Sequence, residues 1–140
     1  MVGVPVTLAA VTEYPDLWAA GVDIVVICNF VTFLERTGAY RRAHRESEYG
    51  SLAHHRDVLE RISPIHKVNR ITAPLMVIHG ANDPRVPIYE AEQMVAALQA
   101  RQQPVEYLRF EDEGHGIVKL GNRIVAYGAI GEFLDRYLSP

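Results

Sequence analysis

The sequence predicts an α/β fold in which helices flank a short, mostly parallel sheet. Two segments, Val22–Cys28 and Pro74–His79, are almost continuous apolar runs rich in β-branched residues, which are typical of parallel strands buried on both faces. Segments with helical spacing separate and follow the predicted strands. This alternation favours right-handed crossovers between parallel strands. A chain of 140 residues is long enough for one core, so we expect a single domain over residues 1–140.

The first half of the chain predicts a helix, a strand and a polar stretch. The segment Thr7–Ala20 carries apolar residues among alanines, as a buried helix would, and a proline within it predicts a break near Tyr14. The strand Val22–Cys28 follows. Residues 30–70 mix charged and aromatic side chains without one clear period, so we expect two or three short helices, one of them ending near Ile62.

The second half predicts a strand, a helix, a strand and a helix. Pro74–His79 is the second strand and ends at Gly80, and Ile88–Gln102 is an amphipathic helix. A third strand covers Val105–Phe110, and a last helix covers Asn122–Leu138. The residues expected to face the core are Ala91, Met94, Val95 and Leu98 from the first helix, and Ile124, Val125, Ile130, Phe133, Leu134, Tyr137 and Leu138 from the second.

Composition and charge exclude several classes of protein. Seventeen acidic and fourteen basic residues give a net charge of −3, which argues against a nucleic-acid or membrane partner. No apolar run is as long as a membrane span, and no Lys or Arg precedes Arg36, so a secretory signal is not indicated. The single Cys28 fits a reducing, cytoplasmic location. No glycine-rich nucleotide loop occurs, so we expect no cofactor.

Polar residues follow all three predicted strands, at the edge where parallel strands place their functional groups. The second strand leads into the loop His79–Pro87 and the third into Glu111–Gly116, while the first ends at Cys28. Asp83 and His115, on two of these loops, suit an acid that orients an imidazole general base. Each residue also has a structural interpretation, Asp83 as a helix cap and His115 as a turn residue.

These loops carry the motifs of a known family. His79-Gly-Ala-Asn-Asp83-Pro-Arg-Val-Pro87 and Glu113-Gly-His115-Gly resemble the end of an α/β-hydrolase. Ile62-Ser-Pro-Ile-His66, Thr72-Ala-Pro-Leu-Met-Val-Ile-His-Gly80 and Tyr107-Leu-Arg-Phe resemble the prolyl oligopeptidase family of serine peptidases, acylaminoacyl-peptidase type. The resemblance runs from about Thr7 to Leu138. It implies acyl transfer from a small ester or peptide to water, with Asp83 as the triad acid and His115 as the triad base.

The nucleophile departs from the family pattern. The family has a Gly-x-Ser-x-Gly-Gly elbow, and counting back from Thr7 places Met1 where the serine belongs, with Gly3 as one elbow glycine. No Gly-x-Ser-x-Gly occurs in the chain. The resemblance therefore implies a truncated, partial α/β-hydrolase domain that keeps the triad Asp and His without the Ser. Weak or unconventional hydrolysis is the expected activity.

Cys28 is an alternative nucleophile. It ends the strand next to the one that leads to Asp83, where His115 would be within reach of its thiol. A buried, inert cysteine is the competing interpretation.

Two further polar clusters are better explained as solvent-exposed surface than as functional sites. Acidic residues flank Arg36, Arg41, Arg42 and Arg45, which favours a solvated helix face over a carboxylate-binding patch. His54 and His55 near Asp57 lack the spacing of metal ligands, so no metal is expected.

The predicted sheet has an unprotected edge. Asp23 is the only charged residue in Val22–Cys28, and an exposed edge of this kind pairs readily with another chain. We therefore expect a homodimer whose two edges complete one sheet, with domain swapping as one version of it. The alternative function is a catalytically inert scaffold that acts by self-association or by complementing another chain.

Overall fold

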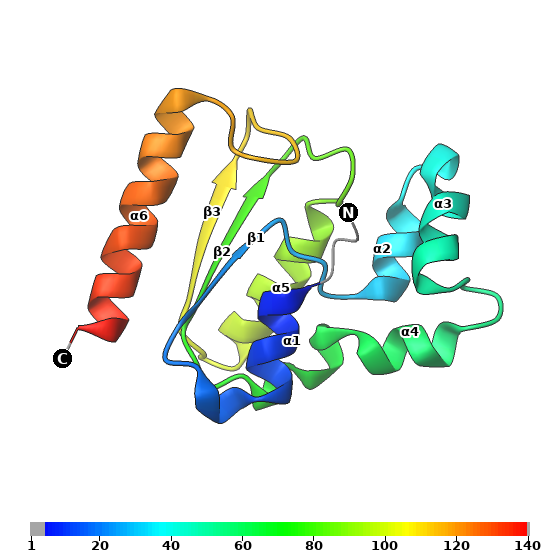
Figure 1. Cartoon of the computed structure of the whole chain (residues 1–140), viewed down its shortest axis with the longest axis horizontal. Coiled ribbons are helices and arrows are strands. Elements are labelled where there is room, and N and C mark those ends of the chain that lie inside the picture. Colours follow the sequence, from blue (N-terminus) through cyan, green and yellow to red (C-terminus); the bar gives the residue numbers. More distant parts are fainter. Residues whose placement is uncertain (1–4, 140) are drawn as a thin grey trace.

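The computed structural model describes residues 5–139, which form a three-stranded parallel sheet between two layers of helices (Figure 1). The elements in chain order are α1 (Val6–Glu13), a 3-10 turn (Pro15–Leu17), β1 (Gly21–Ile24), α2 (Phe30–Arg36), α3 (Ala39–Tyr49), α4 (Arg56–Ile62), a 3-10 helix (Pro64–Arg70), β2 (Leu75–Gly80), α5 (Tyr89–Ala100), β3 (Val105–Phe110) and α6 (Leu120–Leu138). The predicted α/β class and the parallel sheet are confirmed. Within the described residues, no helix is long and apolar enough to cross a membrane.

The sheet has the order β1-β2-β3, with β2 in the centre. Gly21 pairs with Leu75 and Leu75 pairs with Val105, so the three strands start in register. Helix α6 covers one face, and α1 and α5 cover the other (Figure 1). Every residue of β2 is buried because the strand has helices on both faces, which explains its unbroken apolar run.

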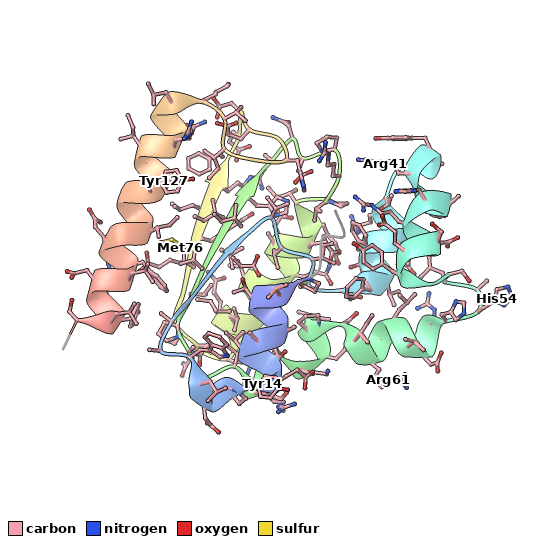
Figure 2. The ribbon with its side chains drawn as sticks, in the orientation of Figure 1. Tyr14, Arg41, His54, Arg61, Met76 and Tyr127 are labelled. Carbon is pink, nitrogen blue, oxygen red and sulfur yellow. The ribbon has the colours of Figure 1, made fainter. Side chains whose placement is uncertain are left out.

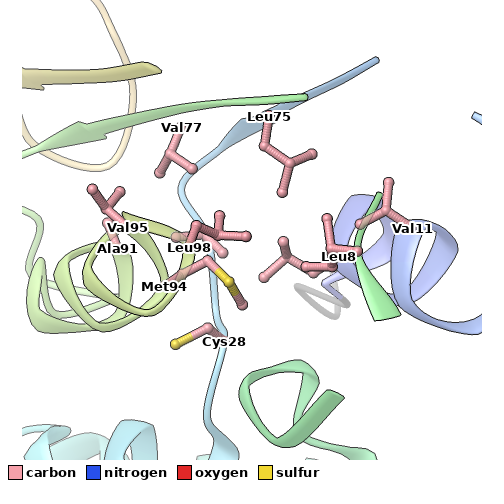
Figure 3. Packing of buried hydrophobic residues seen from close by; sticks show 11 residues of the cluster. Leu8, Val11, Cys28, Leu75, Val77, Ala91, Met94, Val95 and Leu98 are labelled. Carbon is pink, nitrogen blue, oxygen red and sulfur yellow. The ribbon is translucent and has the colours of Figure 1, made fainter. Parts of the chain in front are cut away.

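Alternate residues of β2 supply the two faces of the core. Leu75 and Val77 pack against Leu8 of α1 and against the apolar side of α5 (Figure 3). Met76 and Ile78 pack on the other face against Phe133 of α6; Figure 2 shows Met76 between the sheet and this helix. The four core residues predicted for the helix before β3 are all buried: Ala91, Met94, Val95 and Leu98.

Strand β1 is shorter than the predicted Val22–Cys28. It ends at Ile24 because Val25 adopts a φ of 68°, in the left-handed region that a β-branched residue rarely occupies. Val26, Ile27 and Cys28 are nevertheless buried, since the chain turns away from the sheet and inserts them among the helices. The apolar run therefore reflected full burial only in its second half, since Ile24 at the end of β1 is 44% exposed, and strand structure only in its first half.

Helix α6 also departs from the prediction. It begins two residues earlier, at Leu120. Phe133 is buried and Ile130 packs on the sheet, as expected, but Ile124, Val125 and Leu138 are exposed. The helix touches the sheet along one narrow stripe, so apolar residues on its remaining surface stay in contact with solvent.

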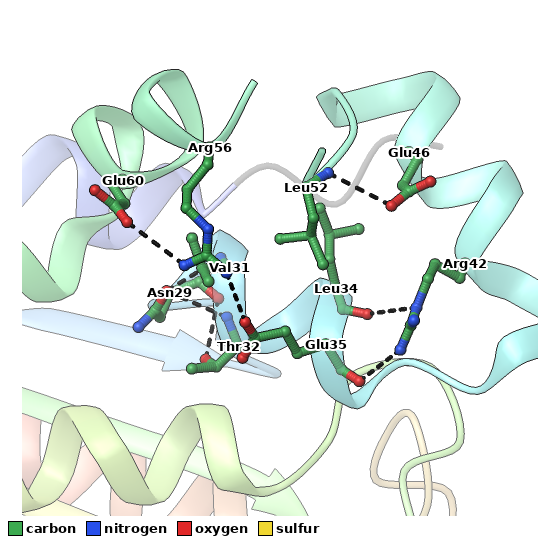
Figure 4. Close-up of polar contacts among 10 residues, drawn as sticks. All are labelled: Asn29, Val31, Thr32, Leu34, Glu35, Arg42, Glu46, Leu52, Arg56 and Glu60. Atoms are coloured by element: carbon green, nitrogen blue, oxygen red, sulfur yellow. Dashed lines mark hydrogen bonds and ion pairs between the residues drawn. The ribbon is translucent and has the colours of Figure 1, made fainter. Parts of the chain in front are cut away.

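The polar middle forms three short helices, and the third ends at Ile62 as predicted. The side chain of Asn29 caps α2 by accepting hydrogen bonds from the backbone N–H groups of Val31 and Thr32 (Figure 4). Arg42 ties α3 to α2 through the carbonyl oxygens of Leu34 and Glu35. Helix α3 buries none of its residues.

Candidate active site

The loops that follow β2 and β3 are joined by backbone hydrogen bonds. The N–H of Ala81 donates to the carbonyl of Phe110 (2.8 Å), and the N–H of Asn82 donates to that of Glu113 (3.0 Å). Gly80 permits this contact, because a Cβ there would lie 2.3 Å from the carbonyl oxygen of Gly114. The glycine at the end of β2 thus brings the two loops close enough for their side chains to meet.

Asp83 and His115 meet at this edge of the sheet. The Nδ1 atom of His115 lies 2.8 Å from Oδ2 of Asp83. The Asp83 side chain has no exposed surface, whereas 34% of the His115 side chain is exposed. The other oxygen of Asp83 accepts hydrogen bonds from the backbone N–H groups of Arg85 (2.7 Å) and Val86 (3.0 Å). Asp83 therefore closes its own loop and orients a histidine at the same time.

The surroundings of Asp83 keep it ionised. Burial alone would raise the pKa of its carboxyl, but the hydrogen bonds from His79, from the backbone of Val86 and Arg85 and from His115 outweigh burial and lower the pKa to about 2. An ionised acceptor favours the His115 tautomer that carries its proton on Nδ1. The lone pair of Nε2 is then available to accept a proton, as a general base requires.

His79 lies behind this pair. Its side chain is fully buried, and its Nε2 atom is 3.0 Å from the carbonyl oxygen of Val86 and 3.5 Å from Oδ2 of Asp83. Its Nδ1 atom has no hydrogen-bond partner among the described residues. His79 belongs to the motif His79–Pro87, but no role was predicted for it from the sequence. Its position at the end of a buried strand, four residues before Asp83, was the available signal.

Glu113 holds the loop that carries His115. It is buried, and its carboxylate accepts hydrogen bonds from the backbone N–H groups of Val118 (3.2 Å) and Lys119 (2.9 Å) and from the side chain of Asn122 (2.9 Å). Burial opposes ionisation here, but these donors lower the pKa of Glu113. The start of α6 is thereby fixed to the loop between Phe110 and His115.

His115 lines a cavity of about 430 Å³. Most of the lining residues belong to the start of α1, to β1 and to the segment after it, and polar and apolar atoms share the wall about equally. Val86 closes the side next to Asp83, and Asp23 of β1 contributes a buried carboxylate. The cavity places an exposed histidine edge beside a space that a small organic molecule could enter.

The structure places Cys28 elsewhere. Its side chain is buried in the cluster with Met94, and its Sγ atom donates to the carbonyl of Glu90 (3.0 Å) (Figure 3). Burial, and then the neighbouring Glu90 carboxylate, raise the pKa of the thiol strongly. Ile27 is among the described residues that line the cavity, and Cys28 is not. The predicted nucleophile position, Met1, lies outside the described residues, as does Gly3.

The adjacent histidines lie far from this edge of the sheet. His54 is at the outer end of the loop between α3 and α4 (Figure 2), and the ring of His55 accepts a hydrogen bond from the backbone of Ser51 (3.0 Å). Within residues 5–139 no group of three or more His, Cys, Asp or Glu side chains is arranged to hold a metal ion.

Two curated relatives are similar to nearly the whole chain. The chain is 38% identical over 138 residues to dipeptidyl peptidase family member 6 of Caenorhabditis elegans and 39% identical over 132 residues to dipeptidyl aminopeptidase BIII of Pseudoxanthomonas mexicana. These alignments cover 94% and 90% of this chain and 19% of each relative. The chain therefore spans about a fifth of the length of the curated relatives it matches.

Two solved peptidase structures are also similar to nearly the whole chain. A puromycin-hydrolysing peptidase of Mycobacterium tuberculosis superposes with a TM-score of 0.84 at 30% identity, over 96% of this chain and 21% of that protein. The acylaminoacyl peptidase of Pyrococcus horikoshii has the same fold, with a TM-score of 0.86 at 23% identity, over 96% of this chain and 22% of that protein. The model of the prolyl oligopeptidase family matches residues 3–140. Because this match covers nearly the whole sequence, the chain belongs to the prolyl oligopeptidase family of hydrolases.

Proposed function

We propose that this chain contributes to the transfer of an acyl group from an ester or peptide to water, with His115 as general base and Asp83 as the residue that orients it. The observation that carries the proposal is the 2.8 Å contact between Nδ1 of His115 and the buried carboxylate of Asp83. The exposed part of His115 borders the cavity, so a substrate carbonyl bound there would be beside Nε2.

In this reaction His115 moves a proton and the attacking oxygen forms the new bond. The oxygen of water adds to the carbonyl carbon while its proton passes to Nε2 of His115. The same proton then goes to the leaving alcohol or amine as the acyl bond breaks, which restores the neutral imidazole. Asp83 stays ionised throughout and stabilises the imidazolium between the two steps.

We expect slow hydrolysis, restricted to activated esters. A general base alone does not replace a serine nucleophile, and each oxyanion-hole donor is worth about 3 kcal/mol in this kind of reaction. Peptide cleavage, with its poor leaving group, would be far slower than ester cleavage.

The test is hydrolysis of 4-nitrophenyl acetate. We expect His115→Ala to reduce the rate at least about tenfold, since general-base catalysis contributes about a hundredfold or more. His66→Ala is the matched control because His66 is exposed outside the cavity, and it should keep the rate of the unchanged protein. Equal rates for His115→Ala and the unchanged protein would refute the proposal.

Cys28→Ala tests the alternative nucleophile. The burial of the thiol and its hydrogen bond to Glu90 weigh against direct attack on substrate, so we expect this variant to keep its esterase activity. If instead Cys28→Ala and His115→Ala abolish the activity equally, the thiol is the nucleophile and His115 is its base.

A second candidate function is the non-catalytic scaffold, and the edge of the sheet favours it. Strand β1 is the terminal strand of the described sheet, and Ile24 on it is 44% exposed. An apolar edge of this kind suits pairing with a second copy or with another chain. Absence of esterase activity in every sample, together with a stable dimer in solution, would favour the scaffold over the hydrolase.

A further inference from the structure

His79 is a buried imidazole with partners on one ring nitrogen and none on the other. Its side chain has no exposed surface, and its Nε2 atom lies 3.0 Å from the carbonyl oxygen of Val86 and 3.5 Å from Oδ2 of Asp83. A carbonyl oxygen can only accept a hydrogen bond, so Nε2 carries a proton and donates it. Both acceptors belong to the loop that presents Asp83 to His115, so His79 supports this loop from the end of β2.

The other ring nitrogen of His79 is one of two buried polar atoms that lack a partner in this part of the sheet. Nδ1 of His79 makes no hydrogen bond with any described residue. The same is true of Oδ2 of Asp23, a residue that is 7% exposed. Buried polar atoms are nearly always hydrogen-bonded in folded proteins, so each of these two atoms requires a partner.

The pairing of β1 with β2 places Asp23 and His79 on the same face of the sheet. Asp23 pairs with Val77, and His79 is two residues further along β2, so its side chain points to the same side. Burial raises the pKa of the Asp23 carboxyl to about 6, and the charge of nearby His79 limits the rise. A carboxyl oxygen and an imidazole nitrogen can each donate or accept, depending on which carries the proton. Each atom can therefore supply what the other lacks.

We propose that Asp23 and His79 share one proton and form a second acid–imidazole pair, which positions Asp83 for His115. The proton lies between Oδ2 of Asp23 and Nδ1 of His79, directly or through one ordered water molecule. When the oxygen holds it, both groups are neutral; when the nitrogen holds it, they form an ion pair. In both forms Nε2 of His79 keeps its own proton and donates it towards Asp83.

The two acid–imidazole pairs are joined at one oxygen atom. Oδ2 of Asp83 is 2.8 Å from Nδ1 of His115 and 3.5 Å from Nε2 of His79. A donor behind the carboxylate restricts its rotation and favours its ionised form, on which the Nδ1–H tautomer of His115 depends. His79 is thus a positioning residue that acts through Asp83, and in this respect the proposal rests on the proposed function.

The first test records the ring nitrogen signals of the histidines by NMR. In the unchanged chain, His79 should carry a proton on Nε2, and a proton on its Nδ1 alone would overturn the proposal. The amide nitrogen of Gln is as many bonds from the backbone as Nε2 of histidine, whereas that of Asn is one bond closer and does not reach Asp83. We expect His79→Gln to keep the Nδ1–H tautomer of His115. His79→Asn should shift the His115 signals towards those of the exposed His66. Unchanged His115 signals in His79→Asn would overturn the positioning role.

The second test measures urea unfolding of Asp23→Val, His79→Gln and the double variant. Removal of an unpaired buried charge stabilises a protein, whereas removal of a paired group leaves its partner unsatisfied. We therefore expect Asp23→Val to lower the urea midpoint of the unchanged chain and to raise that of His79→Gln, which has no nitrogen at the Nδ1 position. The coupling should be at least about fivefold in the unfolding equilibrium constant. Asp57→Asn, at an exposed carboxylate, is the control and should have the same effect in both backgrounds. Equal effects of Asp23→Val in the two backgrounds would overturn the pairing.

Neither test requires turnover of a substrate, so the two proposals fail separately. A chain without esterase activity would refute the proposed function, and the ring signals and the coupling would still decide the roles of Asp23 and His79. In an active chain, His79→Asn should also lower kcat for 4-nitrophenyl acetate about tenfold with KM unchanged, and His79→Gln should retain it. Equal losses of kcat in the two variants would overturn the assignment of the role to the Nε2 donor.

Discussion

Asp83 receives hydrogen bonds from two histidines and two backbone N–H groups, so the folded state stabilises its ionised carboxylate. Its carboxyl has a pKa of about 2 in the folded protein and an ordinary value of 3.8, a difference worth about 2 kcal/mol of stability. A lowered pKa contributes this stability fully above about pH 4. The contribution is lost as the pH falls towards 2.

Urea unfolding of Asp83→Asn against the unchanged protein, between pH 2 and pH 6, measures this contribution. We expect the difference in the free energy of unfolding to be largest above pH 4 and to shrink by about 2 kcal/mol at pH 2. Asp57→Asn should give a difference that does not change with pH. A constant difference for Asp83→Asn would mean that its hydrogen bonds do not favour the ionised form.

The meeting of Asp83 and His115 at one edge of the sheet was predicted from the sequence, and the positions of their neighbours were not. Asp83 and His115 sit in short loops after recognisable strands, so strand order alone places them at one edge of the sheet. His79 and Asp23 lie inside apolar runs, where a polar residue has no periodic signal of its own. Their roles depend on which atoms face them across the sheet, and that information is tertiary.

Helix α5 and the start of α2 are joined by Glu90. Its buried carboxylate accepts hydrogen bonds from the backbone N–H groups of Cys28 (3.2 Å) and Asn29 (2.9 Å) and from the hydroxyl of Thr32. These contacts bridge about sixty residues of sequence and fix the segment that leaves the sheet after β1. This segment carries Ile27, so the wall of the cavity depends on them.

Glu90→Ala should lower the free energy of unfolding by about 2–4 kcal/mol, because it leaves buried N–H groups without acceptors. Glu92→Ala, two residues along the same helix, removes a half-exposed ion pair to Arg109 and should cost less than about 1 kcal/mol. Urea unfolding of both variants measures the difference. Equal losses would mean that the Glu90 contacts contribute no more than a surface ion pair.

Helices and strands whose apolar residues recur at one clear spacing were predicted well. An element whose end depends on local backbone strain was not. The predicted third strand matches β3 residue for residue, and α5 lies within the predicted helix. The end of β1 depends on the positive φ of Val25, which a run of β-branched residues does not indicate. Several apolar residues of α6 were wrongly predicted to face the core, because the prediction assumed that apolar residues are buried.

In the described sheet β1 is an edge strand paired only with β2, and we propose that this edge forms the homodimer predicted from the sequence. Light scattering at micromolar concentration should give the mass of a dimer. Ile24→Lys places a charge on this edge, where Ile24 is 44% exposed, and should give monomers. Ile124→Lys is the matched control on α6, where Ile124 is 66% exposed, and should remain dimeric. A well-folded monomeric wild type, or dissociation by Ile124→Lys alone, would contradict this interface.

The strand order also implies that two features of the site form separately during folding: the contact between Asp83 and His115, and the cavity wall that β1 supplies. Asp83 and His115 come from one β2–α5–β3 unit whose strands pair directly, so local contacts suffice to bring them together. Edge strand β1 lies outside this unit and has only β2 as a partner in the described sheet. Transient opening of β1 would therefore reshape the cavity while the contact between Asp83 and His115 is kept. The wall of the cavity can thus fluctuate, or change in evolution, without separating these two side chains.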